Sequence, residues 1–122
     1  MAASIEPAPV KPTVTVGVLD KIDVRVGRIV LVEDVEKSKK LIKMTVDFGS
    51  FSRTILSGMK EEREDCKAEL EGKQALFVVN LAPRTMAGET SEGMIYDIGY
   101  EDGIVPVLAV PEFEVPDGAR LG

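Results

Sequence analysis

The sequence contains no histidine, no tryptophan and a single cysteine, Cys66. Without histidine it has no Ser-His-Asp triad, no Cys-His pair and no histidine ligand for zinc. A pair of carboxylates is left open as acid–base machinery, but the acidic residues fall mostly in runs such as 61–65, which are typical of solvated faces. We therefore expect no catalytic residues, no metal site and no cofactor.

Long apolar runs are also missing. No stretch approaches the roughly 20 apolar residues of a membrane helix, and residues 1–11 lack the basic start and apolar core of a signal peptide. The lone cysteine forms no internal disulfide, which favours a reducing compartment. These features predict a cytoplasmic protein with no membrane partner.

The 122 residues suit one domain with one core. Pro7, Pro9 and Pro12 stand among small residues near the start of the chain. We expect residues 1–19 to form a flexible Pro-rich arm or linker and residues 20–122 to form the folded domain. Within that arm, the alternation over 14–18 suggests a short strand or a packed segment.

The net charge of −6 argues against a nucleic-acid partner, but the charge is unevenly distributed. Residues 1–60 carry 10 Lys or Arg against 7 Asp or Glu, whereas residues 61–122 carry 5 against 14. A local positive face on an acidic body is compatible with RNA binding. The alternative is a solvated strand face with ordinary lysines, and charge alone favours that alternative.

Alternating apolar residues predict three strands in the first half of the chain. The first runs from Ile22 to about Val32, and its phase slips after Gly27, which indicates a bulge or bend. After the slip, Ile29 and Leu31 are expected to share a face. The second strand covers 41–48 and the third 51–57, with a turn at 49–50.

The second half begins with a predicted helix over 60–71 that ends at Gly72. Further strands are predicted over 74–81 and 93–98, with a polar loop at 83–92 between them and another extended segment at 104–110. Three strands, a short helix and two strands is the layout of the all-β, five-stranded OB-fold barrel. An SH3-like barrel or an unrelated small β fold gives a similar alternation.

Several motifs in this order resemble the tRNA-binding domain family. They cover most of residues 20–122 and are DVRVGRI at 23–29, VDFG at 46–49, RTILSGM at 53–59, LEGK at 70–73, VNLAPRTM at 79–86, Gly88, and SEGM at 91–94. The family includes free-standing structure-specific tRNA-binding proteins and the C-terminal domain of bacterial methionyl-tRNA synthetases. One bacterial branch is described as a secretion chaperone.

The resemblance implies an OB-fold that binds tRNA, as a free-standing protein or as part of a methionyl-tRNA synthetase with a role in protein biosynthesis. It also implies a homodimer, because the end of the chain after Val115 resembles the C-terminal extension that bacterial members use in dimerisation. A dimeric export-related chaperone that binds unfolded peptides is the alternative. One departure is the DVEKSKKL stretch at 34–41, where synthetase-type members carry a histidine-containing turn.

Polar residues in the matching motifs supply a predicted RNA-binding site. Asparagine, arginine, serine and lysine side chains donate to phosphate and 2′-hydroxyl groups, although Asn and Ser also commonly cap loops. Because few aromatic residues are left for stacking bases, we expect recognition of folded tRNA through shape and backbone. The predicted RNA-binding residues are Lys40, Lys43, Arg53, Ser57, Gly58, Asn80, Arg84 and Ser91.

Overall fold

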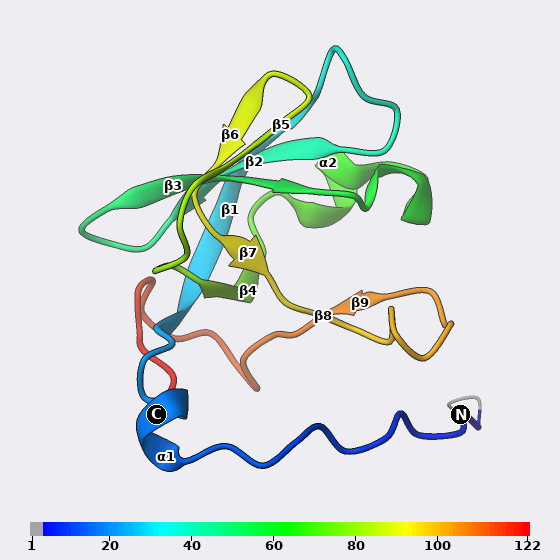
Figure 1. The fold of residues 1–122 in the computed structure, drawn as a ribbon. Helices are drawn as coiled ribbons and strands as arrows, with labels where there is room; N and C mark the ends of the chain where they lie inside the picture. Colours follow the sequence, from blue (N-terminus) through cyan, green and yellow to red (C-terminus); the bar gives the residue numbers. More distant parts are fainter. Residues whose placement is uncertain (1–3) are drawn as a thin grey trace.

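One long strand, β1 (Val24–Asp34), organises the sheet because it pairs along both of its edges. Its second half pairs antiparallel with β2 (Ile42–Asp47), and its first half with β4 (Gln74–Val78). Outside these lie β3 (Ser52–Ser57) and β7 (Met94–Ile95), so that the strand order is β3-β2-β1-β4-β7. Figure 1 shows the sheet curling around β1.

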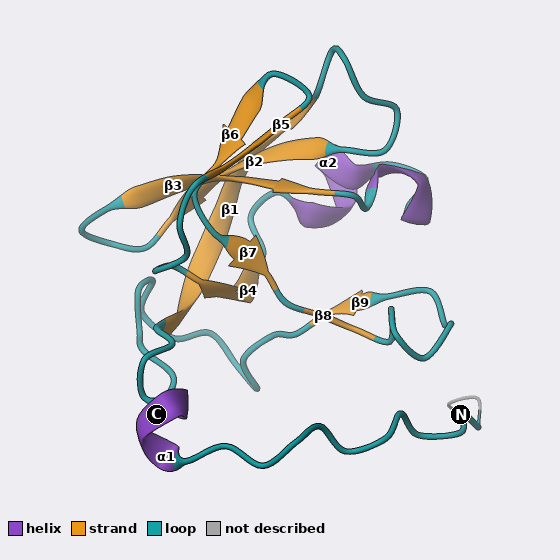
Figure 2. Cartoon of the chain, in the orientation of Figure 1, coloured by secondary structure: helices purple, strands orange, loops and turns teal. Residues whose placement is uncertain are grey.

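The computed structural model describes residues 4–122; residues 1–3 of the predicted arm lie outside the described residues. The short elements are α1 (Val16–Leu19), a 3₁₀ turn (Lys60–Glu62), α2 (Cys66–Leu70), β5 (Arg84–Met86), β6 (Glu89–Ser91), β8 (Asp97–Ile98) and β9 (Val107–Leu108). Figure 2 shows strands dominating the chain, with α2 against one end of the barrel. The all-β fold with a short helix between β3 and β4 is confirmed.

The two edges of the sheet are brought together where β3 meets residues 91–92. The Glu92 N–H donates to the Thr54 carbonyl (2.8 Å), and the Thr54 N–H donates to the Glu92 carboxylate (2.9 Å). One residue pair further on, the Leu56 N–H donates to the Ser91 hydroxyl (3.0 Å). Side chains thus complete a nearly closed five-stranded antiparallel barrel, as the OB-fold prediction requires.

The barrel interior is filled by side chains that alternate along the strands, with Ile29, Met44, Ile55 and Phe77 fully buried. Phe48 packs edge-on against Phe77, with ring centroids 5.5 Å apart. This packing is the main source of stability that the fold offers, because apolar burial dominates folding free energy.

The bulge predicted after Gly27 lies a few residues further along β1. The register shifts between Ile29 and Leu31, and Leu31 is partly exposed while Val32 is buried. The expectation that Ile29 and Leu31 share a face is therefore wrong. Gly27 has a packing role instead, since a Cβ there would lie 2.5 Å from a Val46 methyl and 2.6 Å from the Phe48 ring.

Three other boundaries differ from the predictions. The expected helix over 60–71 is divided into the 3₁₀ turn and α2, because Asp65 caps the Ala68 N–H (3.1 Å) and so starts a new helix. The expected loop at 83–92 contains the β5–β6 hairpin. The segment at 14–18 contains α1, capped by Thr15, in place of a strand.

The end of the chain runs beside the first half of β1. The Gly118 N–H donates to the Val26 carbonyl (2.7 Å), and the Val26 N–H donates to the Ala119 carbonyl (2.9 Å). The amide of buried Gln74 bonds Val115 and the Asp117 carboxylate (2.7 Å). We call this attachment of residues 114–121 the C-terminal clasp. It joins the extension to its own barrel, and the role of the extension in dimerisation stays a prediction.

Candidate nucleic-acid interface

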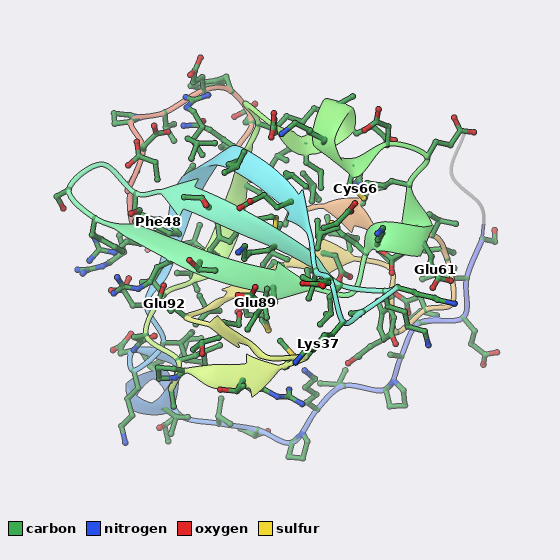
Figure 3. All side chains as sticks on the ribbon, turned by 90° about the horizontal axis from the view of Figure 1, so that it is seen from above. Lys37, Phe48, Glu61, Cys66, Glu89 and Glu92 are labelled. Atoms are coloured by element: carbon green, nitrogen blue, oxygen red, sulfur yellow. The ribbon has the colours of Figure 1, made fainter. Side chains whose placement is uncertain are left out.

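A groove runs between the outer face of the β2–β3 sheet and the β5–β6 hairpin. We call it the hairpin groove; its lining consists of Lys43, Thr54, Pro83, Gly88, Glu89, Thr90 and Glu92. The Lys43 ammonium lies 3.5 Å from the Glu89 carboxylate across the groove. Figure 3 shows Glu89 and Glu92 beside β3. Lys43, from the predicted site, therefore faces the hairpin with a carboxylate beside it.

The β1–β2 loop, residues 35–41, brings further positive charge to the mouth of this groove. Lys37 lies over the hairpin turn, where a Cβ on Gly88 would be 3.9 Å from the Lys37 ammonium. Figure 3 shows Lys37 close to the tip of the hairpin. The hairpin turn itself is tight, with positive φ at both Ala87 (50°) and Gly88 (80°). The loop and the hairpin thus meet at one end of the groove.

Arg84 begins β5 and is exposed. Within residues 4–122 its side chain takes part in no ion pair or hydrogen bond. It follows Pro83, which lines the hairpin groove and fixes the local backbone. An uncommitted guanidinium beside a groove has all its donors available for a phosphate.

Lys40, Ser57 and Gly58 lie together in a second hollow at the far end of β3, apart from the hairpin groove, whereas one shared groove was predicted. The hollow measures about 490 Å³ and is also lined by Ser38, Leu41, Glu62, Asp97 and the exposed Tyr100. Burial, and secondarily the charge of Asp97, raises the pKa of the Glu62 carboxyl. Two carboxylates beside one lysine make this hollow less favourable for a phosphate than the hairpin groove.

The structure gives two of the predicted residues structural partners. The Asn80 side chain accepts from the Asp23 N–H (2.9 Å) and donates to the Lys21 carbonyl (2.7 Å), so that it fixes the approach to β1. Ser91 is buried, and its hydroxyl accepts from Leu56 and donates to the Gly93 carbonyl (3.0 Å). The prediction that Ser91 lines an open groove is therefore wrong.

Arg53 lies at the opposite end of β3 from Ser57 and is not part of the hairpin groove. Its guanidinium carbon is 4.7 Å from the centroid of the Phe51 ring, and that of Arg25 is 5.5 Å from the same centroid. The predicted residues therefore do not form one groove. Lys40, Ser57 and Gly58 line the second hollow, Lys43 lines the hairpin groove, and Arg53 lies over the Phe51 ring.

Lysines and arginines on the α2 flank, the side of the barrel that carries α2, are held mainly in ion pairs. Most of them have carboxylate partners: Arg28 with Asp117 and Glu114, Lys60 with Asp34, Arg63 with Glu69, and Lys67 with Glu71. The hydrogen bond from Lys67 is the main reason that the pKa of the Glu71 carboxyl is lowered. Among the described residues, the cations without ion-pair partners include Lys37, Lys39, Lys40, Arg53 and Arg84.

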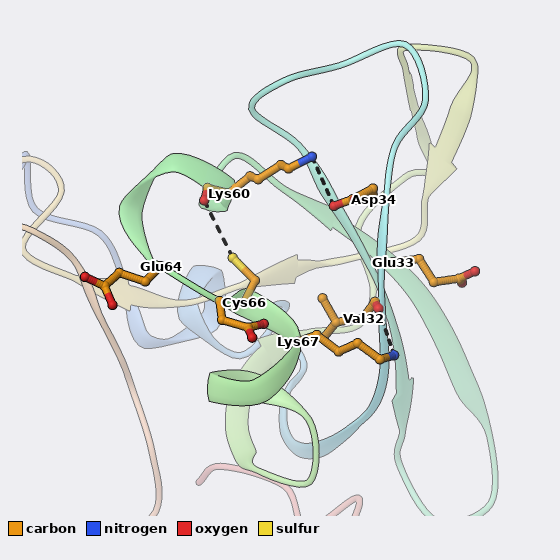
Figure 4. Close-up of a pocket in the computed structure, with 8 residues that line it drawn as sticks. Val32, Glu33, Asp34, Lys60, Glu64, Cys66 and Lys67 are labelled. Carbon is orange, nitrogen blue, oxygen red and sulfur yellow. Dashed lines mark hydrogen bonds and ion pairs between the residues drawn. The ribbon is translucent and has the colours of Figure 1, made fainter.

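The α2 flank also carries a hollow between the end of β1 and α2, shown in Figure 4. Its two lysines are both engaged: the Lys60 ammonium lies 3.0 Å from the Asp34 carboxylate, and Lys67 donates to the Val32 carbonyl (3.4 Å). Burial raises the pKa of the Cys66 thiol, which keeps it protonated and a poor nucleophile.

Sequence reasoning left Lys37, Arg25 and Glu89 out of the predicted site. Lys37 belongs to the basic run at 37–43, so charge density was the available signal. Arg25 and Glu89 depend on contacts between residues 26 and 46 positions apart in the sequence, with Phe51 and Lys43 respectively. Contacts between residues so far apart leave no recognisable pattern in the local sequence.

Over residues 4–122 there is no helix with the length and hydropathy needed to cross a membrane.

Comparison with known proteins gives methionine–tRNA ligases as relatives. The chain is 43% identical over 101 residues to that of Methanococcus vannielii and 40% identical over 111 residues to that of Archaeoglobus fulgidus. These matches cover 83% and 91% of the chain, but only 15% and 16% of the ligases. The chain thus corresponds to about one-sixth of the length of these relatives.

Solved structures share the fold over nearly the whole chain. A MetRS related protein from Pyrococcus horikoshii superposes with a TM-score of 0.83 at 38% identity, covering 92% of this chain and 100% of that one. A CsaA chaperone protein from Picrophilus torridus superposes with a TM-score of 0.77 at 27% identity, covering 90% and 100%. The family model described as "Putative tRNA binding domain" matches residues 24–120, and the chain belongs to this tRNA-binding domain family.

Proposed function

We propose that the chain is a non-catalytic module that holds folded tRNA by its backbone and shape, on the side of the barrel that carries the hairpin groove. The observation that carries the proposal is the gathering of uncommitted cations there. Lys37 of the β1–β2 loop lies at the hairpin turn and Arg84 begins β5, while Lys43 on β2 faces Glu89 across the groove. The same loop carries Lys39 and Lys40, and Lys40 lines the second hollow. OB-folds use this same face and these two connections for oligonucleotides.

The charge of the whole chain does not oppose this proposal. The acidic surplus lies in residues 61–122, where Glu69, Glu71, Glu114 and Asp117 pair with cations of the α2 flank. An uncommitted lysine or arginine releases counterions from RNA when it binds a phosphate, whereas a paired one must first leave its carboxylate. The local distribution therefore matters more than the net value of −6.

Recognition through shape is supported by the lack of stacking platforms in the hairpin groove. Of the barrel aromatics, Phe48 and Phe77 are buried, and the Phe51 ring is covered by Phe48 and two guanidiniums. The hairpin groove itself is lined by no aromatic residue. Bases splayed from a single strand have nothing to stack on there, so contacts to phosphates and 2′-hydroxyls are left.

Filter binding of total tRNA across a salt series tests the proposal. We expect retention at low salt, with the logarithm of the association constant falling linearly with the logarithm of salt concentration, by about 0.7 to 0.9 per phosphate contact. Unstructured RNA of equal length should compete poorly. Failure to retain tRNA at low salt would remove the proposed function.

The relation to methionine–tRNA ligases supports a role beside a synthetase. We infer that the module works as part of, or together with, a methionyl-tRNA synthetase body, where it raises the effective concentration of tRNA at the catalytic domain. Adding the isolated chain in trans to a truncated ligase, and comparing aminoacylation with that of the joined protein, tests this role. Stimulation only in the joined protein is the expected result.

A homodimer is supported by unpartnered apolar side chains around β8, β9 and the following segment. Ile98, Val105, Val107, Val110 and Phe113 each expose more than half of their surface. Apolar patches of this kind commonly mark protein interfaces. We infer that a second copy covers them, and that Val107→Lys yields a monomer in sedimentation equilibrium while the original chain is dimeric.

The same apolar segment, with the likeness to a CsaA chaperone protein, favours one second candidate. In that role, unfolded peptides would occupy the exposed apolar side chains in place of a second copy. Light scattering of an aggregating unfolded client distinguishes the two. Slowed aggregation without tRNA retention would favour the chaperone, whereas tRNA retention without protection of the client favours the tRNA-binding module.

A further inference from the structure

At the end of the barrel near the β2–β3 turn, two aromatic rings stack on each other and two arginines lie against the outer ring. The Phe51 ring lies nearly parallel to that of buried Phe48, with centroids 5.1 Å apart and an interplanar angle of 16°. Because Phe48 is itself held against Phe77, the Phe51 ring has a fixed position. The guanidiniums of Arg53 and Arg25 lie 4.7 and 5.5 Å from its centroid, so their orientation is fixed too.

A single carboxylate, that of Asp23, organises a third arginine at the same place. The Asp23 carboxylate accepts from Arg25 Nε (3.1 Å) and from Arg120 Nε (3.2 Å). The hydrogen bond from Arg25, and then that from Arg120, holds its pKa below the ordinary value against the opposing effect of burial. Asn80 fixes the backbone of Asp23 in turn. Arg53 is left with only a bond to the Ser52 carbonyl (3.2 Å).

We propose that Arg25, Arg53 and Arg120 form a second anchor for bound RNA, a phosphodiester site at the end of the barrel that is separate from the hairpin groove. We call these residues the arginine cluster. The inference rests on the proposed function and extends it. Arg25 and Arg120 share the Asp23 carboxylate, and Arg53 has no ion-pair partner among the described residues, so the three guanidiniums and one carboxylate together carry a net charge of two positive units.

The chemistry of the cluster favours a phosphate. A guanidinium that stacks on an aromatic ring directs its N–H fork sideways, and that fork matches the two free oxygens of a phosphodiester. Phe51, Asp23 and Asn80 hold the forks in place before a ligand arrives, which reduces the entropy lost on binding. Flexible surface lysines lack this support.

The position of the cluster also suits an RNA backbone that follows β3. Arg53 directly precedes Thr54, which lines the hairpin groove, and Ser57 at the other end of β3 lines the hollow of Lys40. From Arg53 to Ser57 the strand spans about 13 Å at roughly 3.3 Å per residue. Figure 3 shows Phe48 at one end of the barrel and Lys37 toward the other. Because Arg53 and Thr54 point to opposite faces of the strand, an RNA backbone reaches both anchors by passing from the groove around this end of β3.

The closing experiment measures tRNA affinity over a salt series for Arg120→Gln, Arg53→Gln and Arg25→Gln, with Lys73→Gln as control. Lys73 is exposed, has no ion-pair partner among the described residues and lines a hollow with Arg28 and Glu114 that includes no member of the arginine cluster. We expect each arginine variant to bind about 3- to 10-fold more weakly at low salt, with a slope smaller by up to about 0.9, and the control to match the original chain.

The design separates a structural role from a binding role. Arg120 is largely exposed and its side chain contacts only Asp23 in the described chain, so Arg120→Gln should unfold at the same urea concentration as the original. Arg25→Lys keeps the charge but loses the fork, and it should recover the salt slope only in part. If Arg25→Gln does not fold, Arg120→Gln and Arg53→Gln decide the outcome.

Two results would overturn the inference alone. In the first, the original chain binds tRNA and the folded arginine variants keep its affinity and slope. In the second, the arginine Nε–H resonances move on addition of a polyglutamate peptide but not on addition of tRNA, which would make the cluster a site for an acidic protein segment. A chain that retains no tRNA at all would instead remove the proposed function, and this anchor with it.

Discussion

The two flanks of the barrel use the same kinds of side chain for different purposes. On the α2 flank and at the clasp, Arg28, Arg63 and Lys67 are tied to carboxylates. On the flank of the hairpin groove, Lys40 and Arg84 have no such partners in the part of the chain that the structure describes. The positive side chains on the α2 flank and at the clasp therefore stabilise the fold, whereas those on the flank of the hairpin groove are available to a ligand. Mutations on the two flanks should accordingly separate stability from binding.

The largest effect is expected at the clasp, from Gly118→Ala. Gly118 has a φ of +93°, and a Cβ there would collide with the Phe48 carbonyl. We expect the free energy of unfolding to fall by about 2 to 4 kcal/mol, since positive φ and backbone overlap both oppose alanine. Urea unfolding measures the change.

Gly103→Ala is the matched control for this substitution. Gly103 also has positive φ (+74°), but nothing lies within 4 Å of a Cβ there. It should lose only about 1 kcal/mol, the strain of the backbone conformation alone. Equal losses at the two glycines would show that the clasp is not closely packed against the barrel.

The next effect is expected from Gln74→Met, which keeps the length of the side chain but removes its amide. The amide bonds Val115 at both backbone groups and the carboxylate of Asp117. Because Gln74 is buried, the abandoned groups are poorly hydrated, and we expect a loss of about 2 kcal/mol in urea unfolding. Because Arg120 of the clasp is held by Asp23 and not by Gln74, tRNA affinity in the folded variant should be unchanged; a parallel loss of affinity would mean that loosening the clasp displaces Arg120.

On the groove side, Arg84→Gln should leave urea unfolding unchanged, because the side chain has no partner within residues 4–122 to lose. We expect tRNA affinity at low salt to fall about 3- to 10-fold, as one phosphate contact is removed. Filter binding beside Lys73→Gln measures it. Intact affinity would exclude Arg84 from the interface.

A smaller change in the opposite direction is expected from Glu89→Gln. Glu89 faces Lys43 across the hairpin groove at 3.5 Å and places a negative charge where a phosphate must approach. Its removal should raise tRNA affinity about 2- to 5-fold at low salt, with little effect at high salt, where the charge is screened. Glu112→Gln, at an exposed position outside the groove, is the control. Weaker binding by Glu89→Gln would show that Glu89 supports the site.

The smallest effect concerns acid stability. The Asp23 pKa is lower in the folded chain than the ordinary 3.8, so Asp23 stabilises the fold above that value and loses this contribution as the pH falls through the lower folded pKa. Asp23→Asn should therefore flatten the dependence of unfolding free energy on pH below about 4. Urea unfolding between pH 2 and 6 checks this; an unchanged profile would contradict the assigned ion pairs.

The strands were predictable from the sequence wherever one face is buried, as along β2, where Ile42, Met44 and Val46 alternate with half-exposed residues. The β5–β6 hairpin was not, because its turn uses Ala87 and Gly88, and alanine at positive φ (50°) is not a recognised hairpin signal. Gly27 was misread because close packing and a bulge both require glycine in a strand.

The candidate site was predictable only as a set of residue types. The basic run at 37–43 indicated the β1–β2 loop, and the motifs indicated Arg84. Which polar side chains stay available depends on partners distant in sequence. The Ser91 hydroxyl accepts a hydrogen bond from the Leu56 N–H, and the Asn80 side chain accepts one from the Asp23 N–H. These partners are far apart in the sequence, so no local pattern predicts them.

The most direct test compares two double variants that remove the same charge from the two flanks. These are Lys40→Gln with Arg84→Gln on the groove side, and Lys67→Gln with Lys73→Gln on the α2 side. Filter binding of total tRNA should give the first pair a salt slope smaller by about 1.5 and the second pair the original slope. Equal losses in both pairs would contradict the account, because tRNA would then respond to net charge and not to the groove.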